Sequence, residues 1–260
     1  MHQTEDTIAR VRPWIQDARR VVVLTGAGVS AESGVPTFRG EKGLWRSWDP
    51  MQLATPEAFR QDPRVVWAWY RWRQNLVRRC LPNPGHHALV TLQKRLGKHL
   101  SLVTQNVDGL HARAGSLAVN ELHGNLFADR CTRCRAVEDA FARTPDDRIH
   151  PENPEFDPPL PLCRACGGLM RPGVVWFGEQ LPDGAMESAA SDVRKADLLL
   201  VVGTSGVVYP AAGLADEARR AGARVVVVNT EATSHSSSAS CTILGPSAQI
   251  LPALVNPEAR

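Results

Sequence analysis

The chain has 260 residues, of which 43% are hydrophobic and 22% are charged, and its formal net charge is +3. These values are typical of a soluble globular protein with one large domain, or one large domain that carries a smaller insertion. They argue against a strongly basic nucleic-acid-binding protein, and no apolar run approaches the roughly 20 residues that a membrane span needs.

The N-terminal stretch does not resemble a targeting segment. It has no apolar signal core, and the acidic residues Glu5, Asp6 and Asp17 interrupt its arginines, which argues against a transit peptide. We therefore expect a cytoplasmic protein with no membrane partner, no specific nucleic-acid partner and a monomeric state.

The first elements predict a helix followed by a buried strand. Apolar residues recur at helical spacing over residues 5–19, with Pro13 as a possible kink, and Val21–Leu24 is a β-branched run typical of a central parallel strand. The strand leads directly into Gly26-Ala27-Gly28-Val29-Ser30-Ala31, a Gly-x-Gly arrangement in which backbone N–H groups can approach a pyrophosphate. However, no clean second strand ends in an acidic residue about 20 positions later, where an ordinary dehydrogenase would hold the ribose.

The next segment combines a glycine-rich loop with helices. Residues 34–43 read either as a mobile loop that closes over a ligand or as an ordinary surface loop. Residues 50–83 predict helices, with Pro56 and Pro63 in first turns. Tyr70 and Arg73 are three residues apart and share a helix face, so a phenol and a guanidinium could together bind a carboxylate. The alternative is an arginine that extends to solvent beside a packed aromatic ring.

A helix over residues 85–96 and a strand over Leu100–Val103 precede the most polar stretch of the chain. This stretch contains Gln105, Asn106, Asp108, His111 and His123. Such a mixture of amides, a carboxylate and imidazoles is expected of a pocket at the carboxyl end of a strand. Taken singly, Asn-x-Asp-Gly is also a plausible turn, and a lone histidine is more often structural than a base.

Two cysteine pairs indicate a metal site. Cys131-x-x-Cys134 and Cys163-x-x-Cys166 flank a long segment in which residues 145–161 are proline-rich and therefore predict a loop. Four thiolates in two such pairs predict a closed, structural zinc site. A redox pair is the alternative, although it would need only one Cys-x-x-Cys. Cys80 and Cys241 match no functional position and are expected to be packing residues.

The last third returns to alternating strands and helices. Residues 198–202 predict a strand that ends in Gly203-Thr204-Ser205. A helix is expected from Pro210 to about Ala221, and a second strand over residues 224–228 ends in Asn229-Thr230-Glu231. The serine run 236–240 predicts a surface loop.

Together these motifs resemble, in order, those of the sirtuins, a family of NAD-dependent protein lysine deacylases. The resemblance covers residues 20–254 and includes Gly34 to Arg39, Thr104 to His111, His123-Gly124 and both cysteine pairs. It implies a Rossmann-like parallel-sheet domain (residues 1–36, 84–124 and 172–260), a helical module (37–83) and a zinc-binding module (125–171).

The resemblance also implies roles for individual residues. His123 would be the general base, Asn106 and Asp108 would hold the nicotinamide carboxamide, and Gln105 would contact the ribose. The remaining residues implied to bind NAD are Gly26, Ala27, Gly28, Ser30, Thr37, Phe38, Arg39, Trp45, Gly203, Thr204, Ser205, Asn229, Glu231 and Ser247. An acyl-lysine peptide would add as a strand beside residues 174–179, with Val175 and Phe177 among its contacts, and deacylation would yield nicotinamide and O-acyl-ADP-ribose.

A narrower resemblance concerns the acyl group. Ala54-Thr55-Pro56, Tyr70 with Arg73, and residues 207–212 look like the branch that removes succinyl, malonyl and glutaryl groups. In that branch the Tyr and Arg bind the acyl carboxylate, and a small residue at the Ala54 position leaves room for it. The alternatives are an enzyme that is mainly a deacetylase or an ADP-ribosyltransferase, a zinc-ribbon binding module, and a hydride-transferring dehydrogenase.

Overall fold

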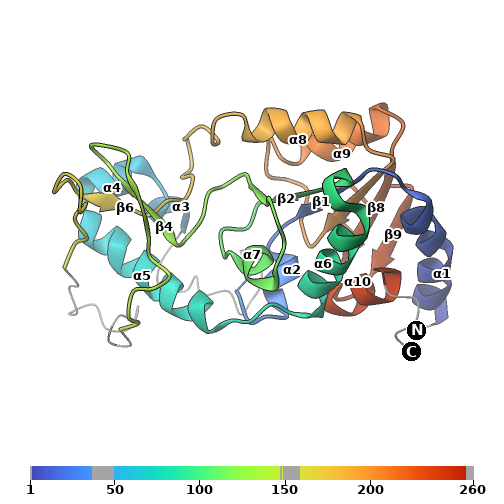
Figure 1. The fold of residues 1–260 in the computed structure, drawn as a ribbon, viewed down its shortest axis with the longest axis horizontal. Helices are drawn as coiled ribbons and strands as arrows, with labels where there is room; N and C mark the ends of the chain where they lie inside the picture. The colour runs from blue at the N-terminus through green and yellow to red at the C-terminus, as the bar shows by residue number, and fades with distance from the viewer. Residues whose placement is uncertain (1, 37–49, 147, 149–158, 256–260) are drawn as a thin grey trace.

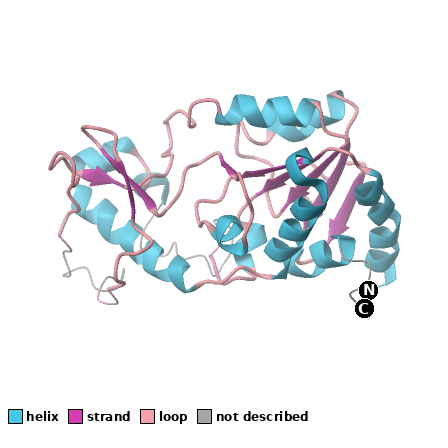
Figure 2. Ribbon diagram, in the orientation of Figure 1, coloured by secondary structure: helices cyan, strands magenta, loops and turns pink. Residues whose placement is uncertain are grey.

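The computed structural model describes residues 2–36, 50–146, 148 and 159–255, and Figure 1 shows their arrangement. In chain order the elements are α1 (His2–Asp17), β1 (Val21–Thr25), α2 (Gly28–Ala31), α3 (Pro50–Leu53), α4 (Pro56–Gln61), α5 (Pro63–Arg79), α6 (Pro84–Leu96), a 3-10 turn (Gly97–His99), β2 (Leu100–Thr104), α7 (Leu110–Ala114), β3 (Asn120–Glu121), β4 (Ala128–Cys131), β5 (Val137–Asp139), β6 (Met170–Arg171), α8 (Ala185–Arg194), β7 (Leu198–Val202), α9 (Gly213–Arg220), β8 (Arg224–Asn229), β9 (Cys241–Leu244) and α10 (Ser247–Val255). The strands form two sheets that lie toward opposite ends of the molecule (Figure 2).

The larger sheet has the strand order β3-β2-β1-β7-β8-β9, and all of its neighbouring strands are parallel. β1 is central, with Val21 level with Leu100 of β2 and with Leu198 of β7. The chain builds outward from β1 to β3 on one side and then crosses to β7 on the other. This reversal confirms the predicted Rossmann-like class, in which ligands bind beyond the carboxyl ends of the strands where the order reverses.

Successive side chains of each strand point to opposite faces of the sheet, so the core consists of two layers, one on each face. Val21 and Val23 of β1 pack with buried residues of α1, α6 and α10, whereas Val22 and Leu24 pack with those of α8 and α9. Figure 1 shows α8 and α9 together over one face of the sheet and the other three helices over the opposite face. Because both faces are covered, β1 and β7 consist entirely of buried residues, which explains their unbroken apolar sequences.

The smaller sheet is antiparallel, with the order β5-β4-β6, and it packs against α4 and α5. Both helices begin as predicted, with Pro56 and Pro63 in their first turns, and the side chains of Thr55 and Asp62 cap them. The indole N–H of Trp67 on α5 donates to the carbonyl oxygen of Met170 on β6 at 2.9 Å. The boundaries given above for the helical and zinc-binding modules stay a prediction.

The chain leaves the larger sheet and returns to it at a narrow crossing. Gly124 and Val174 form an isolated antiparallel bridge, and the Asn125 amide donates to the Gly173 carbonyl at 3.0 Å. A Cβ atom on Gly173 would lie 1.6 Å from the carbonyl oxygen of Ala128, and a Cβ on Gly124 would lie 2.2 Å from that of Gly173. Two backbone segments therefore touch here at a separation that only glycine permits.

Several elements differ from the sequence-based predictions. The helix expected to start at Pro210 starts at Gly213, because residues 208–212 form a turn in which Val208 and Pro210 accept from the amides of Ala212 and Gly213. Helices α8 and α10 and strand β9 were not predicted. No helix in the described ranges combines the length and hydropathy that crossing a bilayer requires.

Candidate functional site

The predicted polar residues gather at the carboxyl ends of β1, β2 and β7. The backbone N–H of Gln105 donates to the carbonyl of Thr25 at 3.0 Å, and its side-chain amide donates to the Thr204 hydroxyl at 3.1 Å. Gln105 therefore joins three strand ends at the point where the strand order reverses. Four residues assigned to NAD binding, Thr37, Phe38, Arg39 and Trp45, lie outside the described residues.

The glycines that follow β1 pack against the loop that follows β7. The amides of Gly26 and Gly28 donate to the carbonyls of Val202 and Gly203 at 3.0 and 2.7 Å. Added Cβ atoms on either glycine would lie 2.7 Å from Thr204 or Gly203. Glycine is required here by contact between two loops, and these two amides are not available to a pyrophosphate, which corrects the reason given above for the Gly-x-Gly motif.

Ser30, Asn106 and Asp108 form a buried polar group. The Asn106 side-chain amide donates to the Ser30 hydroxyl at 3.2 Å, and an Asp108 carboxylate oxygen accepts from the Leu110 amide at 2.8 Å. Burial raises the pKa of Asp108 above its usual value, although hydrogen bonds from Leu110 and Ser30 oppose the shift. A carboxylate beside a primary amide offers both acceptors and donors, which is what recognition of a carboxamide needs.

Behind this group lie two buried histidines. The Ser30 hydroxyl is 3.4 Å from the Nε2 atom of His86, the Thr25 hydroxyl is 2.9 Å from the Nε2 atom of His111, and the two imidazole rings are 4.9 Å apart. Burial lowers the pKa of His86 to about 4 and that of His111 to about 3, so both rings are neutral at pH 7 and act as hydrogen-bonding supports. Sequence reasoning missed His86; the only signal was its place in a capping box with Asn83 at the start of α6.

His123 is oriented as a base. Its Nδ1 atom lies 3.0 Å from the carbonyl oxygen of Gln105, which can only accept, so the proton is on Nδ1 and Nε2 keeps its lone pair. The ring is partly buried, and burial lowers its pKa while the bond to Gln105 opposes the shift. A neutral imidazole with a free lone pair can accept a proton at neutral pH.

A short segment, residues 174–177, links His123 to the candidate acyl-binding residues. The Val175 amide donates to the His123 carbonyl at 2.8 Å, and the Phe177 amide donates to the Ala54 carbonyl at 2.9 Å. The Trp176 amide donates to the Glu179 carboxylate at 2.9 Å. A peptide beside this segment therefore cannot pair with these three N–H groups, so the predicted strand addition would have to use other groups of the segment.

Tyr70 and Arg73 lie on one face of α5, as predicted. The Arg73 guanidinium carbon is 5.9 Å from the centre of the Tyr70 ring and 4.8 Å from that of Trp69. Burial raises the pKa of Tyr70 to about 12, so the phenol is protonated at every physiological pH. Burial lowers the pKa of Arg73, opposed by Tyr70 and Asp108, but an arginine remains charged.

The residues assigned to the adenosine half of NAD lie along the same edge of the sheet. Asn229 ends β8, and its side-chain amide donates to the carbonyl of Glu231 at 3.1 Å. Ser247, at the start of α10, is buried, and its hydroxyl donates to the Glu32 carboxylate at 3.3 Å. Glu32 also accepts from the Ala248 amide. The structure thus gives Ser247 a structural partner, and a contact with adenosine stays a prediction for it and for the partly buried Ser205.

The four paired cysteines converge. The sulfur atoms of Cys131, Cys134, Cys163 and Cys166 all lie within 4.8 Å of one another, and none forms a disulfide. The Cys131–Cys166 and Cys134–Cys163 sulfur separations are 3.5 and 3.6 Å. Four sulfurs bound tetrahedrally to zinc at about 2.3 Å would be about 3.8 Å apart, so the cluster fits a structural zinc ion with no open ligand position.

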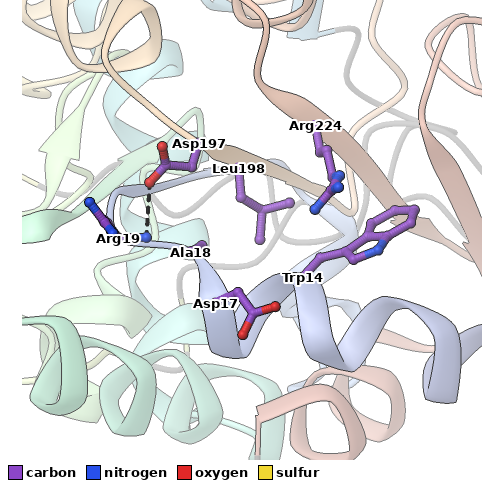
Figure 3. Close-up of a pocket in the computed structure, with 7 residues that line it drawn as sticks. All are labelled: Trp14, Asp17, Ala18, Arg19, Asp197, Leu198 and Arg224. Carbon is purple, nitrogen blue, oxygen red and sulfur yellow. Dashed lines mark hydrogen bonds between the residues drawn. The ribbon is translucent and has the colours of Figure 1, made fainter.

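One cavity lies away from these residues, at the amino ends of β1, β7 and β8. It encloses about 210 Å³ and is lined by Trp14, Asp17, Ala18, Arg19, Asp197, Leu198 and Arg224 (Figure 3). Asp197 accepts from the amides of Arg19 and Arg20 at 2.9 and 2.8 Å, and the Arg224 guanidinium lies 5.0 Å from the centre of a Trp14 ring. The cavity lies at the opposite ends of these strands from the polar residues described above and contains none of the predicted site residues.

Comparison with known proteins gives one consistent answer. The profile of the Sir2 family matches residues 26–210. The chain is 50% identical over 252 residues to an "NAD-dependent protein deacylase" of Ralstonia nicotianae, with 95% of each chain covered. It is 49% identical over 241 residues to "NAD-dependent protein deacylase 2" of Pyrobaculum aerophilum, with 93% of this chain and 92% of the relative covered.

Solved structures agree with this result. A crystal structure of a Sir2 homologue–NAD complex superposes with a TM-score of 0.86 at 42% identity, over 96% of this chain and 93% of the other. A complex of Sir2 with a p53 peptide and NAD superposes with a TM-score of 0.80 at 30% identity, over 96% and 98%.

Proposed function

The chain belongs to the Sir2 family, and we propose that, as an NAD-dependent protein deacylase of that type, it acts preferentially on lysines whose acyl group ends in a carboxylate, such as succinyl and malonyl. The observation that carries the acyl preference is the pairing of a buried Tyr70 phenol with the Arg73 guanidinium on one face of α5. Arg73 and Asp108 are close enough to influence each other's pKa, which supports a receptor next to the polar site.

The polar site fits the nicotinamide end of NAD. Asn106 and Asp108 would bind the carboxamide, and Gln105, which joins the three strand ends, would lie against the ribose. When bound, NAD supplies an electrophilic ribose carbon once nicotinamide has left. His123 would accept a proton from a ribose hydroxyl on its Nε2 atom, because its Nδ1 proton is held by the Gln105 carbonyl. The four cysteines would hold a structural zinc ion that ties β4 of the smaller sheet to the segment around Cys163 and Cys166.

The acyl-lysine would lie between His123 and Ala54. Residues 175–177 join these two positions by backbone hydrogen bonds, and Ala54, with its small side chain, packs against the same cluster as Tyr70. A carboxylate there would accept from the phenol and from the guanidinium, and charge-assisted hydrogen bonds of this kind contribute about 1.5–3 kcal/mol. An acetyl group has no oxygen at this distance and would forgo that contribution.

The test compares one peptide carrying succinyl-lysine or acetyl-lysine, with mass spectrometry as the readout and NAD present or absent. We expect the wild-type enzyme to remove succinyl faster in the presence of NAD only, and Arg73→Met to lower the succinyl-to-acetyl ratio of kcat/KM roughly 10- to 100-fold. Arg64→Met, an exposed position on the same helix, should leave the ratio unchanged.

Other outcomes would change the assignment. Equal losses for both acyl groups in Arg73→Met would refute the carboxylate receptor. Faster removal of acetyl by the wild-type enzyme would retain a deacylase and replace the proposed acyl preference. Release of nicotinamide without loss of either acyl group would indicate ADP-ribosyl transfer instead.

A further inference from the structure

Trp176 is an aromatic residue next to the proposed acyl site that contacts a cation, a phenol and a second ring. It is 3% exposed, and the Arg171 guanidinium stacks on it with 3.5 Å between its carbon and the centre of the ring. Arg171 in turn forms an ion pair with Glu179, whose other oxygen accepts from the Trp176 backbone amide at 2.9 Å. The indole also packs near the Phe59 ring, with 5.2 Å between ring centres. The ring therefore has one available orientation.

In that orientation the indole N–H points at the phenol oxygen of Tyr70, at a distance of 2.9 Å. An indole nitrogen can donate a hydrogen bond but cannot accept one, whereas a phenol oxygen can accept and also donates its single proton. The Tyr70 oxygen is consequently the acceptor in this pair. Its own proton cannot point toward Trp176 and must be directed elsewhere.

No acceptor for the Tyr70 proton is found among the described residues, although the side chain is almost fully buried. A buried hydroxyl that donates to nothing is costly, at about 1–3 kcal/mol. The charged groups that influence its pKa are Arg73, Arg171 and Glu179. The two arginines offer no acceptor, and the Glu179 carboxylate already accepts from the Arg171 guanidinium and the Trp176 amide. A phenol proton with no acceptor in the described ranges, close to two guanidinium groups, favours an anionic acceptor.

We propose that Trp176 is a positioning residue for acyl specificity: its indole N–H fixes the Tyr70 hydroxyl so that the phenol proton is directed at the carboxylate of the acyl group. The proposal deepens the function proposed above and rests on it. Trp176 itself does not contact the acyl carboxylate. The Arg171–Glu179 pair belongs to the same device, because it holds the indole ring that orients the phenol.

The variant that tests this is Trp176→Phe, which keeps an aromatic ring and removes the indole N–H together with part of the ring volume. Without that donor the phenol can rotate, so the KM for the succinyl peptide should rise roughly three- to tenfold with kcat little changed. Both constants for the acetyl peptide should stay the same. Tyr70→Phe should produce a similar loss for succinyl, and adding Trp176→Phe to Tyr70→Phe should cause no further loss, since the two act on one hydrogen bond.

Trp67→Phe is the matched control. Trp67 is also a buried tryptophan of the same hydrophobic cluster, and its N–H also donates at 2.9 Å, but to the Met170 carbonyl. Its removal should lower stability and leave the succinyl-to-acetyl ratio unchanged. If the wild-type enzyme prefers succinyl and Trp176→Phe leaves the succinyl-to-acetyl ratio of kcat/KM unchanged, this inference is wrong while the proposed acyl preference stands. Equal losses of kcat/KM for both peptides in Trp176→Phe leave that ratio unchanged and lead to the same conclusion. A wild-type enzyme that prefers acetyl and is indifferent to Tyr70→Phe would overturn the inference together with the proposed acyl preference.

Discussion

The ion pair between the buried Asp129 carboxylate and the partly exposed Arg143 guanidinium allows a sharp prediction about how firmly the small sheet is held to α5. Asp129, on β4, is completely buried, and its carboxylate accepts from Arg143 at 2.6 Å and from Gln74 of α5 at 3.3 Å. Burial raises the pKa of Asp129 above its usual value even though Arg143 and Gln74 oppose the shift. Arg143→Met would remove the hydrogen-bonded cation from this buried carboxylate and leave only the longer-range charge of Arg71. Removing the partner of a buried charge costs up to about 3–5 kcal/mol of unfolding free energy.

The size of the effect should depend on the charge of Asp129. Asp129→Asn removes the buried charge and keeps a similar shape, so we expect a smaller loss, and in that background Arg143→Met should cost no more than about 1 kcal/mol. The difference gives a coupling energy of roughly 2–4 kcal/mol. An acid whose pKa is raised in the folded state stabilises the fold when it is protonated. The loss of unfolding free energy caused by Arg143→Met should therefore become smaller as the pH falls from 7 to 5.

Urea unfolding followed by tryptophan fluorescence is a suitable assay, because the Arg143 guanidinium lies 6.0 Å from the centre of a Trp67 ring. The matched control is Arg60→Met, which removes an arginine from a pair with the same 2.6 Å separation but with both side chains 71% exposed. Exposed pairs contribute about 0–1 kcal/mol. Similar losses in Arg60→Met and Arg143→Met, or an undiminished loss in the Asp129→Asn background, would refute the reasoning.

Two further predictions concern the polar site. His123→Ala should lower kcat at least about 100-fold with an unchanged circular dichroism spectrum, as loss of a general base does. Burial lowers the pKa of His123, so the wild-type kcat/KM should stay constant on the acid side until the pH drops below ~6.5. A kcat/KM that already declines at pH 7 or above would contradict this role. Gly203→Ala should destabilise the protein by about 2 kcal/mol or more in thermal unfolding, because the residue has φ +62° and its Cβ would lie 2.3 Å from the Val29 nitrogen. Gly222→Ala, with φ +91° and no atom within 4 Å of its Cβ, should cost only about 1 kcal/mol, and equal losses would show that the contact with Val29 is unimportant.

The elements found from sequence were those whose residues are buried on both faces or marked by caps. β1 and β7 are uninterrupted apolar runs, and α4 and α5 carry Pro after a capping side chain. Helix α8 escaped notice because only Ala189 and Val193 are buried in it, which gives a weak apolar pattern. Strand β9 has four residues and follows the serine run, so its pattern is too short to distinguish from a loop.

The site divides in the same way. Gln105, Asn106, Asp108 and His123 lie within one stretch of chain, so their convergence could be expected from a single strand end. The support that His86 gives Ser30 depends on α6 packing beside α2 and α10, and the contact between Trp176 and Tyr70 spans 106 positions in the sequence. Neither leaves a local pattern. The Gly-x-Gly motif was recognised in the sequence, but the structure explains the need for glycine differently. Gly26 and Gly28 contact Gly203 and Thr204 too closely for a side chain.

The narrow crossing at Gly124 and Val174 has a consequence for how this architecture can diversify. The backbone leaves and re-enters the parallel sheet at adjacent points, so residues 125–173 form a closed excursion whose length does not affect the alignment of β1 with β2 or β7. Insertions are best tolerated where the two ends of a segment lie close together. A variant that keeps Gly124 and Gly173 but replaces residues 125–172 by a shorter, longer or unrelated segment should therefore still form the parallel sheet. Different inserted modules could then be combined with the same sheet.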